Sequence, residues 1–506
     1  MSKPFNARAS FALAVLTAAL LILLYPDFNF TWLAPIALAP LLIVLAREPR
    51  PLRRFLLGYV AGVIYWFGVC YWIQFVLEVH GGLGRWGGWG TFLLFCVLKA
   101  LHFGLFSLLA AILMRHWYAI PAIAALWTGI ERTHADLGFT WLLLGNAGID
   151  MPLPMRLAPI VGVYGLSFVF AMISVAVALI ILRRPRKQLL WLTPLVLLFA
   201  LPALPAPEPT TATATLVQPA VPEEYDWTPE NTAQAENRLA NLTYDAALIS
   251  KPQLLIWPEV PGPFYWYADP GLRQRAADLT HLTGAYFLMG TVAEDAGGPL
   301  NSAVLVNPQG QLVGRYDKMN LVPFGEFVPK IFWWVNRISQ EAGDFVPGKH
   351  IVVFHLGTHK VGTFICYESA FSDFVHQFAA RGANVLVNIS NDGYFGHTHA
   401  RAQHLELVRM RAAENARWLL RDTNDGITAI VDPAGRVTKS APLYQATTLS
   451  GGYAYESRLT PYTKYGDWFP WCCLVAALLL LIATQIPRYE QPTKLKSGGS
   501  PARRRL

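Results

Sequence analysis

The hydrophobic positions of this chain divide it into two kinds of segment. Long apolar segments run roughly through 10–25, 31–46, 55–78, 89–114, 118–131, 157–182 and 188–204, and another lies alone at about 468–486. Most of them approach the ~20 residues that a helix needs to cross a lipid bilayer. The first has no small-residue cleavage site after it, so we interpret it as a span rather than a signal peptide. The pattern predicts a polytopic helical membrane bundle of about eight spans.

The stretch between the last two apolar segments has a different pattern. After a Pro-rich linker, LPALPAPEPTTATA, short apolar runs such as LLIWPE, AYFLMG, VGTFIC and NVLVNIS alternate with polar stretches. Short buried strands that alternate with helices are typical of an α/β domain with a layered sheet. We therefore divide the chain into a seven-span membrane domain at 1–207, an α/β domain at 208–465, an eighth span at 466–487 and a basic tail at 488–506.

Composition supports a membrane protein, and the basic residues predict its orientation. Hydrophobic residues make up 54% of the chain and charged residues only 15%, while the net charge is +8. Lys and Arg concentrate in the connections on one side of the predicted bundle, which is the signature of the cytoplasmic side. The basic residues of that side are Arg47, Arg50, Arg53, Arg54, Arg115, Arg183, Arg184, Arg186, Lys187, Lys494, Lys496, Arg503, Arg504 and Arg505. We expect both termini in the cytoplasm, the α/β domain across the membrane, and a tail that faces anionic lipid rather than nucleic acid.

Three polar residues follow strand-like runs in the α/β domain. Glu259 ends LLIWPE, Lys318 lies in GRYDK, and Cys366 ends VGTFIC. Cys366 is the one cysteine of five outside the predicted spans, so its thiol is either buried and inert or retained for its reactivity. Glu259 and Lys318 have a plainer interpretation as solvated charges, and Glu326 in PFGE as the cap of a turn. Together, however, a Glu, a Lys and a Cys are the residue types of a nucleophilic catalytic set.

Several motifs resemble a known family. WPE at 257–259, YDK and LVPFGE within 316–326, and CYES at 366–369 resemble the nitrilase superfamily, whose fold is an αββα sandwich. The eight-span layout, with GFTW at 138–141, VYGLSF at 163–168 and SNDGYFG at 390–396, is similar to the membrane branch of that superfamily, the apolipoprotein N-acyltransferases. The resemblance implies an enzyme of the bacterial inner membrane with its catalytic domain in the periplasm. It implies acylation of the N-terminal diacylglyceryl-cysteine of apolipoproteins, the last step of lipoprotein maturation.

The resemblance and the chemistry of the side chains assign the same roles. Acyl transfer from an ester to an amine proceeds well in two steps through a thioester, which would form on Cys366 in a ping-pong reaction. A thiol of pKa near ~8.5 needs a base, which would be Glu259, and each oxyanion needs a cation, which would be Lys318. The resemblance adds Glu326, Tyr367 and Glu368 as supporting residues. It implies a glycerophospholipid donor, with phosphatidylethanolamine expected. We also expect a monomer that needs no metal or nucleotide cofactor.

Some positions depart from the pattern of the family. QPA, with Pro219, stands where a QGN-like turn is usual, Asn320 where a His is usual, Gly393 and Tyr394 where Ala and Trp are usual, and Thr140 where a Pro is usual. None of them replaces the Glu, Lys or Cys. They leave the preferred substrate open.

Aromatic residues near the candidate site suggest contact with lipid. Trp227, Trp266 and Trp333 are our candidates, since amphipathic rings sit well among lipid headgroups, and core packing is the alternative for each. His397, His399 and His404 are spaced as H-x-H-x4-H, but a structural role for His404 beside Gln403 is favoured over a metal site. Two other function classes stay open, a membrane-tethered amidase or nitrilase and a transporter or receptor whose outer domain binds a ligand.

Overall fold

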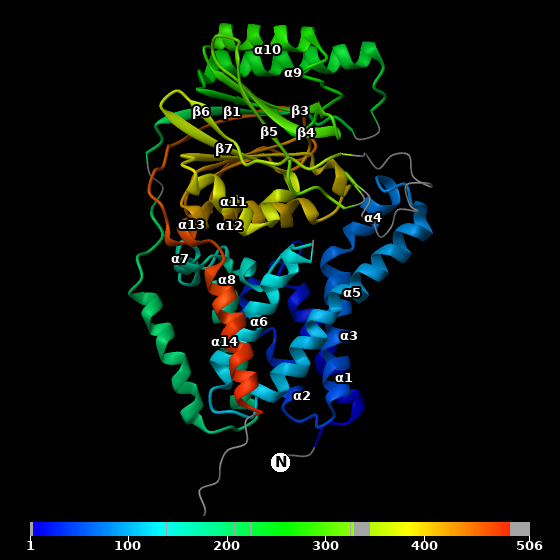
Figure 1. Ribbon diagram of the computed structural model, residues 1–506, viewed down its shortest axis with the longest axis vertical. Coiled ribbons are helices and arrows are strands. Elements are labelled where there is room, and N and C mark those ends of the chain that lie inside the picture. The colour runs from blue at the N-terminus through cyan, green and yellow to red at the C-terminus, as the bar shows by residue number, and fades with distance from the viewer. Residues whose placement is uncertain are drawn as a thin grey trace, which may run out of the picture.

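The protein consists of a helical bundle and an α/β domain stacked end to end, as Figure 1 shows. The computed structural model describes residues 4–137, 139–206, 209–222, 225–323, 325–327 and 345–485. The predicted basic tail and Trp333 lie outside these residues. The first helix and the last one, α14, both reach the end of the bundle that is remote from the α/β domain.

The bundle is built from the apolar segments of the sequence. Its elements are α1 (Ala7–Ile22), η1 (Thr31–Ile36), α2 (Ala39–Leu45), α3 (Pro51–Cys70), α4 (Trp72–Val79), α5 (Gly84–Leu113), α6 (Ala119–Asp136), η2 (Leu144–Gly148), η3 (Pro154–Leu157), α7 (Ala158–Val161), α8 (Val163–Ile181), η4 (Arg186–Phe199) and α14 (Trp468–Ala483). Among the described residues, α3, α5 and α8 are long and apolar enough to cross a membrane, and α1, Thr31–Leu45 and α14 are apolar but shorter. The structure thus supports a membrane protein, while the number of eight spans and the side on which the α/β domain lies stay predictions.

The α/β domain contains two six-stranded sheets packed face to face. The first sheet has the order β12-β1-β2-β3-β4-β5, with β1 (Ala212–Gln218), β2 (Leu254–Ile256), β3 (Tyr286–Asp295), β4 (Gly298–Val306), β5 (Leu312–Asp317) and β12 (Thr447–Tyr453). The second has the order β11-β10-β9-β8-β7-β6, with β6 (Val353–Leu356), β7 (His359–Ile365), β8 (Val385–Ser390), β9 (Leu419–Thr423), β10 (Ala429–Val431) and β11 (Val437–Ser440). In each sheet three central strands are parallel, namely β1, β2 and β3, and β7, β8 and β9.

Helices cover the outer face of each sheet and complete an αββα sandwich. On the sheet remote from the bundle lie α9 (Pro229–Ser250) and α10 (Pro270–Thr283), and on the other sheet lie α11 (Ser372–Ala380), α12 (Ala400–Asn415) and α13 (Pro461–Tyr465). Strand β8 is buried at all its positions because both of its faces are covered. The αββα fold expected from the sequence is confirmed.

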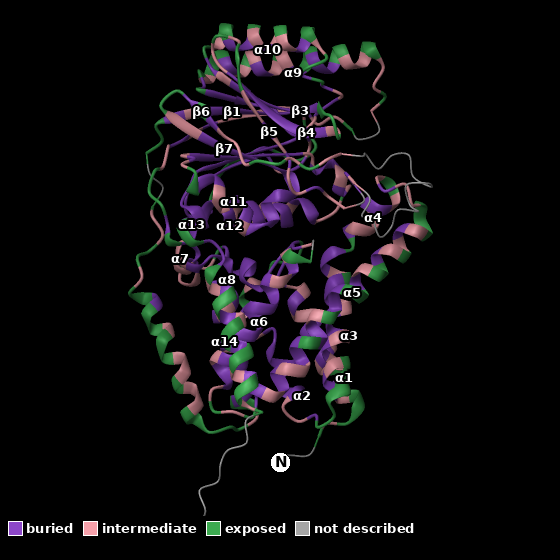
Figure 2. Ribbon diagram, viewed as in Figure 1, coloured by how far each residue is buried: buried purple, intermediate pink, exposed green. Residues whose placement is uncertain are grey.

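Helix α12 belongs to the layer of the sandwich that faces the bundle. Its sequence is strongly polar, yet most of the helix is buried, whereas α9 and α10 expose one face to solvent (Figure 2). Its polar side chains find partners on the bundle. The amide of Gln403 accepts a hydrogen bond of 2.7 Å from Trp141 Nε1 and donates one of 3.1 Å to the carbonyl of Val69, and Glu414 accepts from the amide of Val163. The α/β domain is therefore fixed to the bundle by specific polar contacts.

Candidate active site

The three candidate catalytic residues follow three different strands of the sandwich. Glu259 comes shortly after β2 in the first sheet, Lys318 directly after β5, and Cys366 directly after β7 in the second sheet. The turn that carries Glu259 lies against β3, where a Cβ at Gly290 would come 2.8 Å from the Cα of Glu259. A glycine is therefore required there for the carboxylate to reach the site.

Lys318 pairs with both Glu259 and Glu326. Its Nζ donates to one Oε1 of each carboxylate at 2.9 Å, and the side chains of all three residues are at most 8% exposed. Burial opposes the charge of the ammonium, but the two carboxylates raise the pKa of Lys318 well above its usual value. The lysine is therefore a cation at neutral pH.

Asn301, on β4, is a fourth member of this cluster that the sequence analysis did not find. Its side-chain Nδ2 donates to the same Oε1 atoms of Glu259 and Glu326, at 2.7 Å each, and its main-chain carbonyl accepts from the amide of Lys318. The amides of Asn391 and Val322 donate to the remaining carboxylate oxygens. Asn301 thus brings the two carboxylates together without adding a second positive charge. In the sequence, the one sign of this role is the motif LNSAVLV, which places a polar Asn near the start of a buried strand.

Cys366 occupies the first position of a short helix, η7 (Cys366–Ala370), with a backbone φ of 50°. That left-handed conformation costs a non-glycine residue about 1–3 kcal/mol and persists only where the surroundings impose it. The thiol is buried, and burial together with the neighbouring carboxylate of Glu259 raises its pKa above the usual range, while Lys318 acts in the opposite direction. The sulfur is therefore a neutral thiol in the resting protein and needs a base before it can attack.

Glu368 is a structural member of the site. Its carboxylate accepts hydrogen bonds from the amides of Ile365, Met319 and Asn320 and from the hydroxyl of Tyr316. Burial raises the pKa of Glu368 to about 7, and these hydrogen bonds limit the rise. Glu368 thereby joins the loop that carries Lys318 to the loop that carries Cys366.

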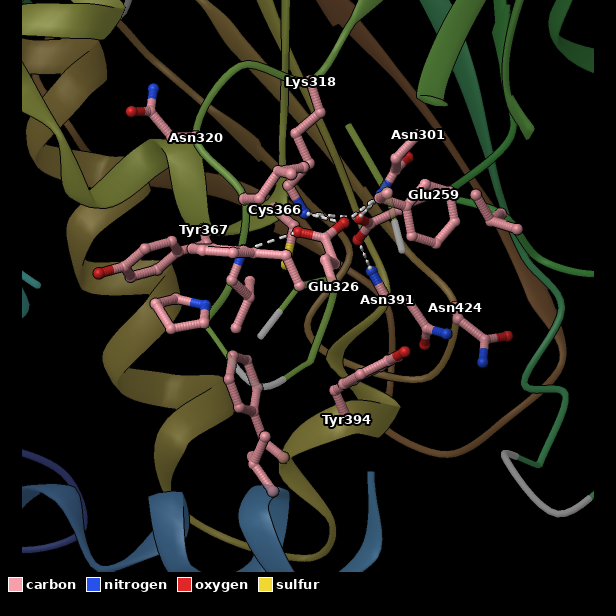
Figure 3. A pocket seen from close by; sticks show the side chains of 18 of the residues that line it. Glu259, Asn301, Lys318, Asn320, Glu326, Cys366, Tyr367, Asn391, Tyr394 and Asn424 are labelled. Atoms are coloured by element: carbon pink, nitrogen blue, oxygen red, sulfur yellow. Dashed lines mark hydrogen bonds and ion pairs between the residues drawn. The ribbon is translucent and has the colours of Figure 1, made fainter. Parts of the chain in front are cut away.

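These residues open into a cavity of about 940 Å³ that lies between the α/β domain and the bundle. Figure 3 shows Lys318, Glu259 and Glu326 converging next to Cys366 in its wall. Most of the other lining side chains are apolar, and they include Trp72 of α4 and Phe95 of α5. The cavity therefore connects the reactive thiol to the surface of membrane helices.

Several other residues named from the sequence line the same cavity. Trp227, Tyr367, Asn320 and Tyr394 line it, and the ring of Tyr394 stacks on His80 of the bundle at 4.1 Å between centroids. Two of the positions that depart from the family pattern, Asn320 and Tyr394, thus lie where a substrate would bind.

Trp266 lies elsewhere. It is 4% exposed and packs in the apolar core between the first sheet and helices α9 and α10, on the side of that sheet remote from the bundle. Its position fits core packing, and our prediction that it contacts lipid does not fit this position.

The three histidines do not gather at one point. His404 is buried behind Cys366, with Nε2 3.1 Å from the Cys366 carbonyl and Nδ1 3.1 Å from Asp392. His399 packs on Tyr71 of the bundle, and His397 on Tyr444. A structural role for His404 agrees with these contacts.

Comparisons with known proteins support the fold and show the family. The family model for carbon-nitrogen hydrolases matches residues 213–452, and that for the apolipoprotein N-acyltransferase N-terminal domain matches residues 17–176. An apolipoprotein N-acyltransferase of Geobacter metallireducens is 32% identical over 94% of this chain and 95% of its own, and one of Ralstonia nicotianae is 32% identical over 94% of each.

Among solved structures, an amidase from a Nesterenkonia species matches 49% of this chain and 93% of its own, with 18% identity and a TM-score of 0.38. A Saccharomyces cerevisiae member of the nitrilase superfamily has the same TM-score, with 17% identity, 49% of this chain and 93% of its own. The family match rests on the sequence relatives, which span nearly the whole chain. This chain belongs to the apolipoprotein N-acyltransferase family, and it is an acyltransferase.

Proposed function

We propose that this protein transfers an acyl chain from a glycerophospholipid to the α-amine of the N-terminal diacylglyceryl-cysteine of apolipoproteins. The observation that supports this most is the cavity, because one wall carries Cys366, Glu259 and Lys318 and another consists of apolar side chains of membrane helices. An acyl chain can reach the thiol through such a cavity without crossing water. A water-soluble amide substrate would not need an apolar path of this kind.

The first half of the reaction forms a thioester. Glu259 takes the proton of the Cys366 thiol, the sulfur attacks the ester carbonyl of the donor, and the bond between the carbonyl carbon and the glycerol oxygen breaks. The leaving lyso-lipid oxygen takes the proton from Glu259. A base is needed because the pKa of the thiol is raised in this site.

The second half transfers the chain to nitrogen. The amine attacks the thioester carbonyl and gives a proton to Glu259, the carbon–sulfur bond breaks, and the thiolate recovers its proton from Glu259. The acyl chain ends in an amide, and the thiol is restored for another turnover.

Lys318 is suited to stabilise the oxyanion of both halves. An ammonium group has three N–H donors, and among the described residues two of them are used by Glu259 and Glu326. The third is available to a developing negative charge in a buried site, where such a bond is strongest. Glu326 fixes the lysine without carrying a step of its own.

We further propose the bacterial inner membrane as the location, with the sandwich in the periplasm and both termini in the cytoplasm. The excess of basic residues in the connections remote from the sandwich supports this orientation. Phosphatidylethanolamine is the proposed donor, and a monomer contains all the catalytic residues.

The test is an intact-mass spectrum of the purified protein after incubation with phosphatidylethanolamine, beside a Cys366→Ala variant. We expect one added acyl mass on the wild type alone, and its removal by a diacylated lipopeptide that becomes triacylated. An adduct lost to water equally fast without the peptide would instead identify a hydrolase. No adduct at all would contradict the covalent mechanism.

A further inference from the structure

Behind the nucleophile lies a buried polar group that the mechanism above does not use. It consists of His404, Asp392 and Arg421, which are all 0% exposed. Arg421 Nη2 donates to both oxygens of Asp392, at 2.9 and 2.7 Å, and also lies 3.1 Å from His404 Nδ1. On the other side of the ring, Nε2 lies 3.1 Å from the carbonyl oxygen of Cys366 and 2.8 Å from Ser369 Oγ.

The contact with the Cys366 carbonyl places a hydrogen on Nε2 of His404. A carbonyl oxygen can only accept, so its contact with Nε2 is favourable when Nε2 carries hydrogen. Nδ1 lies 3.1 Å from Asp392 Oδ1, which can only accept, and 3.1 Å from the Arg421 guanidinium, which can only donate, so these two contacts orient the ring on that side. Burial and the charge of Arg421 lower the pKa of His404, while the carboxylate of Asp392 acts in the opposite direction.

The carbonyl that His404 holds belongs to the peptide unit between Cys366 and Tyr367. In a trans peptide the C=O and the N–H point in opposite directions. Fixing the Cys366 oxygen toward α12 therefore fixes the Tyr367 N–H pointing away from α12. The same hydrogen bond restrains the left-handed backbone of Cys366 from one side, while Glu368 restrains it from the other through the Ile365 amide.

We propose that His404 is a positioning residue for acyl transfer, which orients the peptide between Cys366 and Tyr367 so that the Tyr367 N–H donates to the oxyanion together with Lys318. This inference rests on the proposed thioester chemistry. Ser369 is a secondary partner of the ring, and Asp392 and Arg421 hold the ring in its orientation.

Two substitutions of His404 separate this role from simple packing. Gln places its amide about as far from the backbone as Nε2 and can still donate to the Cys366 carbonyl. Asn places its amide near the position of Nδ1 and cannot reach that carbonyl. We expect H404N to form the acyl-enzyme about 10- to 100-fold more slowly than wild type, and H404Q to recover most of the rate. For comparison, loss of a whole oxyanion donor lowers a rate about 10²–10³-fold.

Alkylation of Cys366 by iodoacetamide provides the second readout. In that reaction the sulfur displaces iodide from a methylene carbon, so no oxyanion forms. H404N should therefore alkylate at a rate within about twofold of wild type while its acylation falls. The matched control is His397→Asn, at an exposed histidine, which should leave both rates unchanged.

The assay measures acyl-enzyme formation from phosphatidylethanolamine by intact mass, with the melting temperature of each variant. Equal losses of acylation and alkylation in H404N, or equal acylation rates of H404N and H404Q, would overturn the proposal. If H404N does not fold, Ser369→Ala decides. Its acylation should match wild type, and a 10-fold fall would show that the hydroxyl rather than the Cys366 carbonyl is the partner that matters. If the wild type itself forms no adduct, the proposed function fails first.

Discussion

Two buried groups of ion pairs in this protein have similar composition but different functions. In one, Lys318 pairs with Glu259 and Glu326 at 2.9 Å. In the other, Arg132, near the end of α6, pairs with Asp136, Asp373 and Asp467 at 3.2, 2.9 and 2.7 Å. Each has one buried cation and a surplus of carboxylates.

The surroundings of the two groups differ. Lys318, Glu259 and Glu326 line a cavity beside a thiol and belong to a single domain. Arg132 joins the bundle to α11 of the sandwich and to the residue before α14, and two of its partners are 48% and 39% exposed. Burial and pairing alone therefore do not mark an active site, since the adjoining cavity and nucleophile are what distinguish the two groups.

The largest effect should follow from Glu259→Gln. Acyl-enzyme formation should fall about 10²–10⁴-fold, because the general base is lost. Alkylation of Cys366 should become faster, because the charge of Glu259 is one cause of the raised pKa of the thiol. Opposite changes in intact-mass and alkylation assays would show that the carboxylate acts as a base. If acylation and alkylation both became slower, Glu259 would have a structural role, like the carboxylates that pair with Arg132.

Replacing each cation by methionine compares the two groups directly. Lys318→Met should lower acyl-enzyme formation about 10²–10³-fold by removing an oxyanion donor. Arg132→Met should lower the free energy of unfolding by about 3–5 kcal/mol, because it removes the cation that pairs with buried Asp467, while the folded fraction keeps most of its activity. Thermal denaturation and single-turnover acylation of both variants provide the check. If both variants lose stability and acylation to the same extent, the two groups of ion pairs do not differ in function.

The pH dependence of thiol alkylation tests the electrostatics of the catalytic group. Because the pKa of Cys366 is raised, the thiolate fraction should increase about tenfold per pH unit without levelling off between pH 7 and 9. Stopped samples at several pH values, analysed by mass, would measure this. A plateau near pH 7 would mean that Lys318 outweighs both burial and Glu259.

Asn301→Ala should have a smaller effect, about tenfold on acylation, because Lys318 still pairs with both carboxylates while they lose a shared donor. Asn301→Asp is the sharper variant, since it adds a third carboxylate at nearly constant volume and should be worse than Ala. Rates from the same mass assay would rank them. A ranking in which Asp is better would indicate that the amide serves only to fill space.

Trp227→Ala should have the smallest effect on chemistry. Its ring lines the cavity, so we expect a several-fold rise in KM for the lipid donor with little change in kcat. The control is Trp266→Ala, which should leave KM unchanged but cost about 3–5 kcal/mol of stability, because that ring is in the core.

The sequence predicted the sandwich and the residues at its strand ends, because both follow from local patterns. Apolar runs that end in Glu259, Lys318 and Cys366 indicate strands with polar ends, and motifs linked them to a family. Asn301 was missed because a single Asn at the start of a strand has no distinctive spacing, and its role appears only when β4 lies between β3 and β5. The ion pairs of Arg132 were not predicted, since Asp373 and Asp467 are 241 and 335 positions away in the chain. For Trp266 the sequence left core packing and lipid contact open, because aromatic residues near a site have the same pattern in a core and in a cavity.

The close packing of α14 against α6 has a consequence for how the protein is made. A Cβ at Gly129 of α6 would lie 2.7 Å from the Cα of Leu474 of α14, so the two helices touch along their backbones. Helix α14 follows the whole sandwich in the chain, and domains form in the order of synthesis. The bundle is therefore completed only after the sandwich has been synthesised, and a chain that ends before α14 leaves this face of α6 uncovered. A product truncated before α14 therefore presents an unpaired membrane helix to quality-control proteases.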